Sequence, residues 1–555
     1  MSTETKRLIL DIETNRAHNT IWIVVTQDVD TGEIQCHTDP STLAPLVKAY
    51  DQIIGHNLIG FDAPVLRTVW NIGIQKSKAV DTLILSRLLN PQLEGGHSLK
   101  AWGRRLSNNK IEFDFEDFDN GLTQEMQEYC IQDVKLTRDL YLHLMDKLGE
   151  WPDATQSILL EHDIAVLCRQ QERNGFKLDV QQAISLRNEL TDKMDDIEAN
   201  VQSVFPPIVE ERWSEKTGKQ LKDRVIVFNL ASRKQIADRL MSLGWKPSKH
   251  TEKGQPIVDE GTLENIDIPE AQLIAEYLMM QKRVGLIDSW LKHVDEKTDR
   301  VHGAIITNGA VTGRMTHHSP NMGQIPSVSK PYGERIRSLW TVDHGNVLVG
   351  TDLSGIELRC LSHYMQDADW QEELLNGDIH QKNADAAGIT RPQAKTLIYA
   401  TLYGAGPTKI GSIVGGGAKE GSEVLQNFYR NTPALSRLME KVKRMAAKGY
   451  VPGLDGRRIL VRSEHAALNS LLQGCGAIIA KQWCVEAHKE IKRQKLSVKQ
   501  VAFVHDEIQV EAQKADAESV ASIMVESANK AGQVLGFRCR VDAEAKIGNN
   551  WFDTH

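Results

Sequence analysis

Residues 501–511 have the sequence VAFVHDEIQVE, in which strand-like runs rich in apolar residues lie on both sides of the triplet His505-Asp506-Glu507. A period of two is typical of a β-strand with one buried face, and a polar break between two such runs favours a hairpin. The triplet would then lie near the tip. This stretch therefore predicts an antiparallel ribbon that presents two carboxylates at one end.

A second apolar strand carries a further carboxylate. The sequence NVLVGTD ends at Asp352 and runs into LSGIELRCLSHY, which has the pattern of a helix. Carboxylates at strand ends suit Mg²⁺, which takes one or two of them together with substrate phosphates and keeps some waters. Two such ions can bind both the attacking and the leaving oxygens of an in-line phosphoryl transfer. We therefore expect Asp352 and Asp506 to share one phosphoryl-transfer site.

A helix is expected between these strands, over RPQAKTLIYATLYG, residues 391–404. Thr390 is a suitable N-cap, Pro392 falls in the first turn, and Gly404 suits the C-terminal stop. Two cations and two aromatic rings recur every four positions along one face: Arg391, Lys395, Tyr399 and Tyr403. Such a face could bind a triphosphate and stack on a base, although an isolated helix of this kind could also be a simple solvated surface.

The N-terminal region predicts a second acidic site. Asp11 and Glu13 point to one face of the strand RLILDIE, and Asp62 follows in GHNLIGFDAPVL. Tyr129 and Asp133 are four residues apart on a predicted helix and so are neighbours. Four acids and a tyrosine can form a two-metal site in which the tyrosine helps to orient an attacking water. A negatively charged surface is the alternative interpretation of any single pair.

Composition allows three or four domains in the 555 residues. Hydrophobic residues make up 41% and charged residues 25%, as in ordinary globular proteins. The seven cysteines form no CxxC pair and are expected to be reduced packing thiols, and we expect neither a membrane span nor a signal peptide. The net charge of −8 does not argue against DNA binding, because active-site carboxylates and a local basic groove can coexist.

The remaining chain shows alternating strand and helix patterns. A second strand is expected at 21–27, long amphipathic helices over 155–200, and further helices up to about 295. The segment 206–222 is polar and is expected to be irregular, whereas 308–333 is rich in turn residues. The last hundred residues have the pattern helix, strand, turn, strand, helix, strand.

Several motifs resemble those of a known family. TDLSGIELR, RPQAKTLIYATLYG and VHDE are similar, in order and spacing, to motifs A, B and C of the DNA polymerase I family (family A). The stretches TGRMTHHSPNMGQIPSVSKPYGERIR, GLDGRRILVRSEHAALNSLLQ and GNNW resemble replicative polymerases of short-tailed phages in particular. The resemblance extends over nearly the whole chain.

This resemblance implies roles for individual residues. Asp352 and Asp506 would bind metal, with Glu507 as the auxiliary acid of the hairpin and Lys395 as a further catalytic residue. Glu357 would be the steric gate that excludes ribonucleotides. The implied contacts to the incoming dNTP come from Arg391, Lys395, Tyr399, Tyr403, His380 and Glu357. The implied contacts to primer–template DNA come from Arg314, Asn469, Gln473 and His505. Tyr399 is the variant that accepts dideoxynucleotides readily in this family.

The N-terminal motifs resemble the 3′–5′ proofreading exonucleases of the DEDD type, tyrosine subtype. DTLILSRLL and GGHSLKAWGRRL are similar to the intervening segments of phage polymerases. The resemblance implies that Tyr129 lies beside the nucleophilic water. It also implies two metal ions held by Asp11, Glu13, Asp62 and Asp133.

The expected fold is an α/β, ribonuclease H-like exonuclease domain followed by a right-hand polymerase domain with an antiparallel palm sheet and helical thumb and fingers. The expected boundaries are exonuclease 1–150, connecting helices and thumb 151–300, palm 301–375, fingers 376–455 and palm again 456–555. The implied cofactors are two Mg²⁺ ions at each site, with Mn²⁺ as a possible substitute.

The implied partners are primer–template DNA, dNTPs and a single-stranded 3′ end, together with a phage helicase–primase and a single-strand-binding protein. Thioredoxin is not expected, because the thumb insertion that captures it is replaced by the short join EKTGKQLKDRVIVFNLASRKQ. We expect no 5′-nuclease domain before Asp11. We expect a monomer in the cytoplasm of a bacterial host.

Two other interpretations remain at this point. The chain could be a nuclease whose C-terminal half only binds DNA, or a replication scaffold without catalysis. The complete set of Asp352, Lys395 and Asp506 speaks against the first, and the four N-terminal acids speak against the second.

Overall fold

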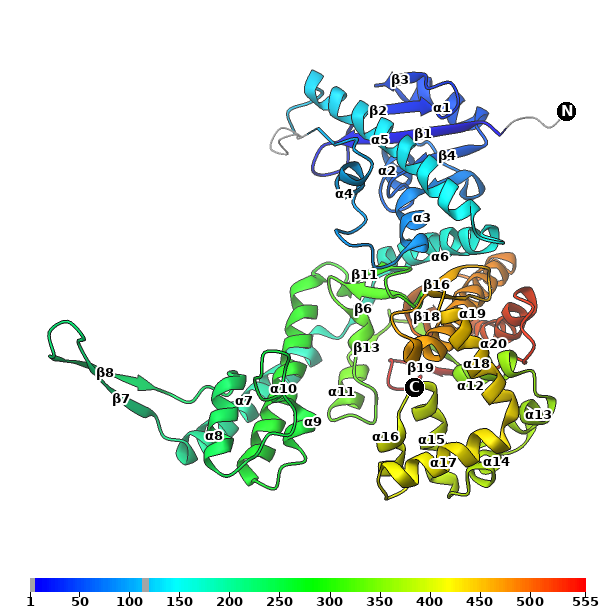
Figure 1. Cartoon of the computed structure of the whole chain (residues 1–555). Coiled ribbons are helices and arrows are strands. Elements are labelled where there is room, and N and C mark those ends of the chain that lie inside the picture. Colours follow the sequence, from blue (N-terminus) through cyan, green and yellow to red (C-terminus); the bar gives the residue numbers. More distant parts are fainter. Residues whose placement is uncertain (1–4, 112–118) are drawn as a thin grey trace. The chain divides into compact units, whose positions relative to one another are not determined.

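The computed structural model describes residues 5–111 and 119–555 (Figure 1). These form two compact units. The first comprises Met1–Gly175, Gly303–Val328 and Val342–His555, and the second comprises Phe176–His302 and Ser329–Thr341. Within the described ranges, no helix has the length and apolar character needed to cross a membrane.

The N-terminal part of the first unit contains a mixed five-stranded sheet of order β3-β2-β1-β4-β5. The central strand β1 runs antiparallel to β2 and parallel to β4, and its residues Leu8, Ile9 and Leu10 are buried. Burial on both faces explains why this strand is apolar apart from its acids. The bounds are β1 Arg7–Thr14, β2 Ile21–Asp28, β3 Ile34–His37, β4 Gln52–Gly55 and β5 Ala79–Asp81.

Helices pack around this sheet and place further side chains beside β1. The long helix α5 packs against β1 and β2, and Thr123 caps its N-terminus by accepting a hydrogen bond from Met126 N. The bounds are α1 Pro40–Ala49, α2 Asp62–Val69, α3 Thr82–Leu89, α4 Leu99–Arg105, α5 Gln124–Gly149 and α6 Thr155–Asn174. The helix predicted to carry Tyr129 and Asp133 is confirmed.

The C-terminal part of the first unit contains a four-stranded antiparallel sheet of order β17-β18-β14-β19. Strand β14 lies between β18 and β19, and β17 and β18 form the hairpin predicted from residues 501–511. The bounds are β14 Asn346–Leu353, β17 Val498–Val504, β18 Glu507–Gln513 and β19 Ala543–Gly548. The predicted order of the last hundred residues is also confirmed, with α19 (Ala467–Arg493) and α20 (Ala517–Val534) as its helices.

A helical region follows β14. The helix predicted from residues 391–404 is α15, which begins at Arg391 and ends at Leu402, with a capping box between Thr390 and Gln393. Gly404 has φ of 74°, a left-handed conformation that suits the position after a helix end. The bounds are α12 Ile356–Met365, α13 Ala368–Asn376, α14 Ile379–Ala387, α15 Arg391–Leu402, α16 Pro407–Ile413, α17 Ala418–Asn431 and α18 Pro433–Ala446.

Helix α19 is almost entirely buried, and four charges are buried with it. Lys481 Nζ is 2.5 Å and Arg457 Nη1 is 2.6 Å from Glu161 Oε1 on α6. Arg457 also pairs with Asp455, Nη2 to Oδ2, at 2.6 Å. The Lys481 side chain is 1% exposed and that of Glu161 0%. This buried charge cluster, comprising Glu161, Asp455, Arg457 and Lys481, joins α6 to the turn between β15 (Tyr450–Pro452) and β16 (Arg458–Leu460) and to α19.

The second unit is built around two long helices, α7 (Val180–Val204) and α10 (Pro269–His293), which pack along each other. Arg187 on α7 pairs with Asp288 on α10, Nε to Oδ1, at 2.8 Å. Shorter elements complete the unit: β6 Phe176–Leu178, α8 Arg233–Ser242, α9 Glu260–Leu263, β9 Val294–Asp295, β10 Arg300–Val301, α11 Gly333–Ser338 and β13 Trp340–Thr341.

The prediction that residues 206–222 are irregular is wrong. They form most of a hairpin between β7 (Ile208–Trp213) and β8 (Gln220–Ile226), which projects beyond α7 and α8 in Figure 1. Every residue of β7 is exposed, so neither face of the ribbon shows the alternation that marks a half-buried strand. Cross-strand pairs such as Glu210 with Arg224 hold the register instead.

Candidate active sites

The strand ends of the four-stranded sheet bring Asp352 and Asp506 together. Asp352 lies near the end of β14, opposite Glu507 of β18, and Leu353 N donates to Asp506 O at 3.0 Å. Burial raises the pKa of Asp506, and the nearby Glu357 carboxylate raises it further, whereas Arg314 acts in the opposite direction. Glu357 therefore lies near Asp506, at the edge of the sheet where the end of β14 meets the hairpin turn. The close approach of the two strand ends was predicted from the sequence pattern. A role for Glu357, which lies on α12, was implied only by the resemblance to family A polymerases.

Glu357 links two of the predicted contact residues. Tyr403 Oη donates to Glu357 Oε1 at 3.0 Å, and Arg314 Nη2 lies 3.5 Å from the same oxygen. These residues come from α12, from the end of α15 and from the loop before β12 (Thr316–His318). The Tyr403 side chain remains 54% exposed, so its ring is available to a ligand. Tyr399, one turn earlier, is half-buried, and the pKa of its hydroxyl is raised by burial and by Glu357.

The cationic end of α15 faces the start of α14. Arg391 Nε is 2.6 Å from Asp378 Oδ2, and Asp378 also caps α14 by accepting from His380 N and Gln381 N. Burial lowers the pKa of His380, and the charges of Arg391 and Lys395 lower it further. The structure therefore gathers two cations and a histidine as the resemblance implies. The pairing of Arg391 with Asp378 was not predicted.

Glu507 is bound by the C-terminal residues of the chain. Its carboxylate accepts from Trp551 Nε1 and from Gln509 Nε2 at 2.7 Å, and His555 Nδ1 lies 3.6 Å away. The sequence suggested an acid at the hairpin tip but not these partners. Trp551 belongs to the motif GNNW, which served in the sequence only as a mark of resemblance.

The predicted DNA contacts lie on three elements: helix α19, the loop that carries Arg314, and the turn between β17 and β18. Asn469 and Gln473 are the half-buried positions, four residues apart, in a stretch of α19 whose other residues are buried. The loop that carries Arg314 packs against α19 next to Gln473. A Cβ atom added to the neighbouring Gly474 would lie only 3.2 Å from the backbone oxygen of Thr312 in that loop. His505 has φ of 60° at the hairpin turn, and burial lowers its pKa.

The N-terminal acids converge as predicted. Asp11 and Glu13 lie on β1, Asp62 begins α2, and Tyr129 and Asp133 share one face of α5. Burial raises the pKa of Asp11 to about 7 with a further contribution from Asp133, and raises that of Glu13 to about 9 with a contribution from Asp11. The pKa values of Asp62 and Asp133 are raised chiefly by burial as well. Carboxyl groups that repel one another in a buried site are typical of a place built for cations.

The oxygens of this cluster fit a hard metal ion. Donor atoms of Asp11, Glu13 and Cys130 lie within 4.8 Å of one another. Among the described residues, Asp133 Oδ1 is buried and has no hydrogen-bond partner. Divalent cations such as Mg²⁺ and Mn²⁺ prefer carboxylate oxygens, so the set of acids fits them and the thiol of Cys130 would contribute little.

Two residues of this cluster were not found from the sequence. Cys130 Sγ lies 3.5 Å from Asp11 Oδ2 and follows Tyr129 directly on α5. Lys110 pairs with Asp133 Oδ2, and its Nζ donates to Tyr129 Oη at 2.8 Å. Lys110 belongs to the polar segment SNNKIEF, whose spacing gives no periodic signal. Its proximity to the acids depends on the path of the chain after α4.

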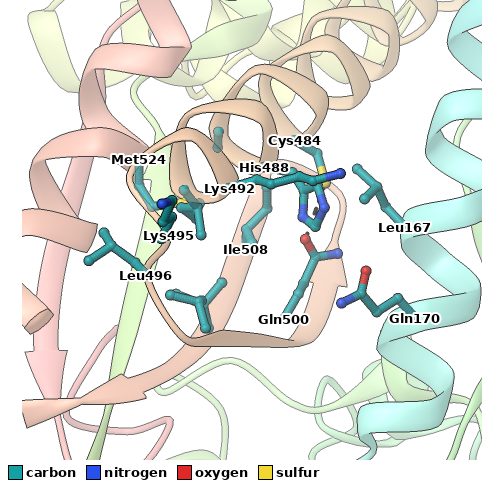
Figure 2. Close-up of a pocket in the computed structure, with 14 residues that line it drawn as sticks. Leu167, Gln170, Cys484, His488, Lys492, Lys495, Leu496, Gln500, Ile508 and Met524 are labelled. Carbon is teal, nitrogen blue, oxygen red and sulfur yellow. Dashed lines mark hydrogen bonds between the residues drawn. The ribbon is translucent and has the colours of Figure 1, made fainter.

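A cavity of about 410 Å³ lies away from both clusters (Figure 2). Residues of α6, α19, β17, β18 and α20 line it, among them Leu167, His488, Lys492 and Met524. None of the residues predicted to bind metal, nucleotide or DNA lines this cavity. The candidate active sites are therefore the two carboxylate clusters and not this cavity.

Comparison with known proteins agrees with the fold. The family model described as DNA polymerase family A matches residues 209–553. The DNA-directed DNA polymerase of Enterobacteria phage T3 is 34% identical, covering 92% of this chain and 93% of the phage protein. That of Escherichia phage T7 is 34% identical, covering 91% and 92%. The solved POL domain of Pol1 from M. smegmatis, in complex with DNA primer-template and dNTP, has a TM-score of 0.80 at 19% identity, covering 100% of this chain and 96% of that one.

The chain belongs to DNA polymerase family A. It is a DNA-templated DNA polymerase of the phage replicative kind, with DNA and nucleotides as its partners and a divalent metal ion as its cofactor. The four-stranded sheet with Asp352 and Asp506 is the palm of a right-hand polymerase fold.

We expect metal binding at the N-terminal cluster to release protons. Burial raises the pKa of Asp11 to about 7 and that of Glu13 to about 9, so near pH 7 Glu13 is mostly protonated and Asp11 about half, and a metal ion must displace these protons. Affinity for Mn²⁺ should therefore rise between pH 6 and pH 9. Titration calorimetry at pH 7 in buffers of different ionisation enthalpy measures the released protons. The double variant Asp11→Ala/Glu13→Ala is the control, and a heat that does not depend on the buffer in the wild type would contradict the expectation.

Proposed function

We propose that this polymerase also removes mismatched nucleotides by a 3′–5′ exonuclease at Asp11, Glu13, Asp62, Tyr129 and Asp133. The observation that carries this proposal is the convergence of four acids, three of them buried and Asp11 half-buried, and one tyrosine from β1, α2 and α5, all with raised pKa values. The strand order of the five-stranded sheet supports the ribonuclease H-like fold expected for such a domain.

The exonuclease would hydrolyse the last phosphodiester of a single-stranded 3′ end. A water oxygen bonds to phosphorus, the bond from phosphorus to the 3′ oxygen of the preceding nucleotide breaks, and a nucleoside monophosphate leaves. Two divalent ions, most simply Mg²⁺, held by the four acids would supply Lewis acidity and neutralise phosphate charge. The Tyr129 hydroxyl would hydrogen-bond the attacking water, since Tyr129 lies four residues from Asp133 and the two side chains share one face of α5.

We further propose how the palm site handles its substrates. Asp352 and Asp506 would hold two Mg²⁺ ions, with Glu507 supporting the hairpin. Arg391, Lys395 and His380 would bind the triphosphate, Tyr403 would stack beside the new base pair, and the primer 3′ oxygen would attack the α-phosphorus as pyrophosphate leaves. Arg314, Asn469, Gln473 and His505 would bind the primer–template. Support comes from the gathering of Glu357, Tyr403 and Arg314 within one network of contacts.

Other expectations from the sequence remain proposals. These are the five domain boundaries, a monomer acting in the host cytoplasm, cooperation with a helicase–primase and a single-strand-binding protein, and the use of Mn²⁺ in place of Mg²⁺. The proposal that the chain acts without thioredoxin is supported by comparing its length with that of the T3 polymerase. The alignment with the T3 polymerase runs over 659 positions, more than the 555 residues of this chain, so the T3 protein has segments that this chain lacks.

The exonuclease proposal is tested with Asp11→Ala/Glu13→Ala. Loss of two metal ligands should lower degradation of a single-stranded oligonucleotide by at least about 10³-fold, because metal activation supplies several kcal/mol. Extension of a matched primer should stay near that of the wild type, since the palm acids are untouched. Equal degradation by both proteins would refute the proposal.

Glu357→Ala should weaken discrimination against ribonucleotides by about 10- to 200-fold, the range for a lost contact with a small group. The side chain that would crowd the sugar 2′ position is removed, and Tyr403 loses its acceptor. The measurement is the ratio of kcat/KM for a dNTP and the matching rNTP. Glu357→Gln keeps the size of the side chain and is the control. Unchanged selectivity in the alanine variant would remove Glu357 from this role.

A further inference from the structure

Lys110 is a cation inside the N-terminal acid cluster. Its side chain is 18% exposed, and its Nζ lies 4.6 Å from the centre of the Tyr129 ring. It pairs with Asp133 and donates to Tyr129 Oη at 2.8 Å. Lys110 thus contacts both of the α5 residues proposed for the exonuclease.

The direction of this hydrogen bond restricts the tyrosine. An ammonium group has three donors and no acceptor, so the Tyr129 oxygen must accept from Lys110. The Tyr129 O–H proton is then offered to a different acceptor. The charge of Lys110 also has a partner inside the site, because Lys110 Nζ pairs with Asp133 Oδ2.

We propose that Lys110 is a positioning residue of the exonuclease: it fixes the Tyr129 hydroxyl as a donor toward the attacking water and holds Asp133 beside it. This inference rests on the proposed exonuclease function. Lys110 acts through Tyr129 and Asp133, and the reaction needs no proton from Lys110 itself. A purely structural ion pair, by contrast, would serve folding and metal binding without depending on the tyrosine hydroxyl.

The test compares Lys110→Met, Lys110→Arg, Tyr129→Phe and the double variant Lys110→Met/Tyr129→Phe in the full chain. Lys110→Met should lower kcat for single-strand degradation by about 10- to 100-fold, as for residues that orient a metal site. KM should change little. In the Tyr129→Phe background, Lys110→Met should lower kcat much less, because the hydroxyl that Lys110 orients is already absent. Lys110→Arg, which keeps a donor and a charge, should recover part of the rate.

Affinity for Mn²⁺, measured by calorimetry without DNA, separates positioning from structure. Lys110→Met removes a cation that competes with the metal ion for Asp133, so Mn²⁺ affinity should be unchanged or higher. If Lys110 had only a structural role, Mn²⁺ affinity should fall in this variant. Lys135→Met is the matched control, since Lys135 is an exposed lysine of α5, and primer extension reports on folding. Wild-type degradation by Lys110→Met, weakened Mn²⁺ binding, or equal losses with and without the Tyr129 hydroxyl would each overturn the inference. If the wild type degrades no faster than Asp11→Ala/Glu13→Ala, the exonuclease proposal itself fails, and the inference fails with it.

Discussion

Replacing Asp506 with alanine is expected to lower primer extension by at least about 10³-fold, because a metal-binding acid at the reacting phosphate supplies several kcal/mol of transition-state stabilisation. Asp506 lies at the turn between β17 and β18, where Leu353 N binds its backbone oxygen and ties it to the end of β14. The fold should survive, since the backbone contact does not involve the side chain. Rapid-quench primer extension with saturating dNTP gives the rate.

Two comparisons make this result specific. Glu518→Ala removes an exposed acid of α20 and should extend primers like the wild type. Degradation of single-stranded DNA by Asp506→Ala should also remain, because its proposed acids lie on β1, α2 and α5. Extension by Asp506→Ala at a rate close to the wild type would remove this residue from the active site.

Lys481→Met should destabilise the chain by about 3–5 kcal/mol, the usual cost of leaving one buried charge without its partner. Lys481 and Arg457 both pair with Glu161 Oε1, and Glu161 is completely buried. Without Lys481 the buried charge cluster holds two acids and one cation. Thermal unfolding should show a clearly lower midpoint. Lys492→Met, at an exposed position of the same helix, is the control.

A double variant separates the buried charge from the lost packing. Glu161→Leu/Lys481→Met removes one acid and one cation and leaves Arg457 with Asp455, which are bound by Nε and Nη2. It should unfold at a higher temperature than Lys481→Met alone, because no buried charge is then unpaired. If the double variant is less stable than Lys481→Met, side-chain packing contributes more to stability at this site than the pairing of charges.

The sequence by itself determined the elements that carry the sites. The strand-like pattern around Asp506 predicted the hairpin, and the spacing of four placed Arg391, Lys395 and Tyr399 on one face of α15, with Tyr403 directly after its last residue. The positions of Tyr129 and Asp133 on α5 followed in the same way. These predictions succeed because periodicity and capping act over a few neighbouring residues. The hairpin at β7 and β8 was missed because both of its faces are exposed.

Only the tertiary structure decided which distant side chains meet. Tyr403 reaches Glu357 across 46 residues, Lys481 reaches Glu161 across 320, and Lys110 reaches Tyr129 from a segment without any pattern. Such contacts depend on how helices and strands pack, which no local spacing encodes. The sequence thus determined a chain with two acidic sites, and packing decided the partners that orient each acid.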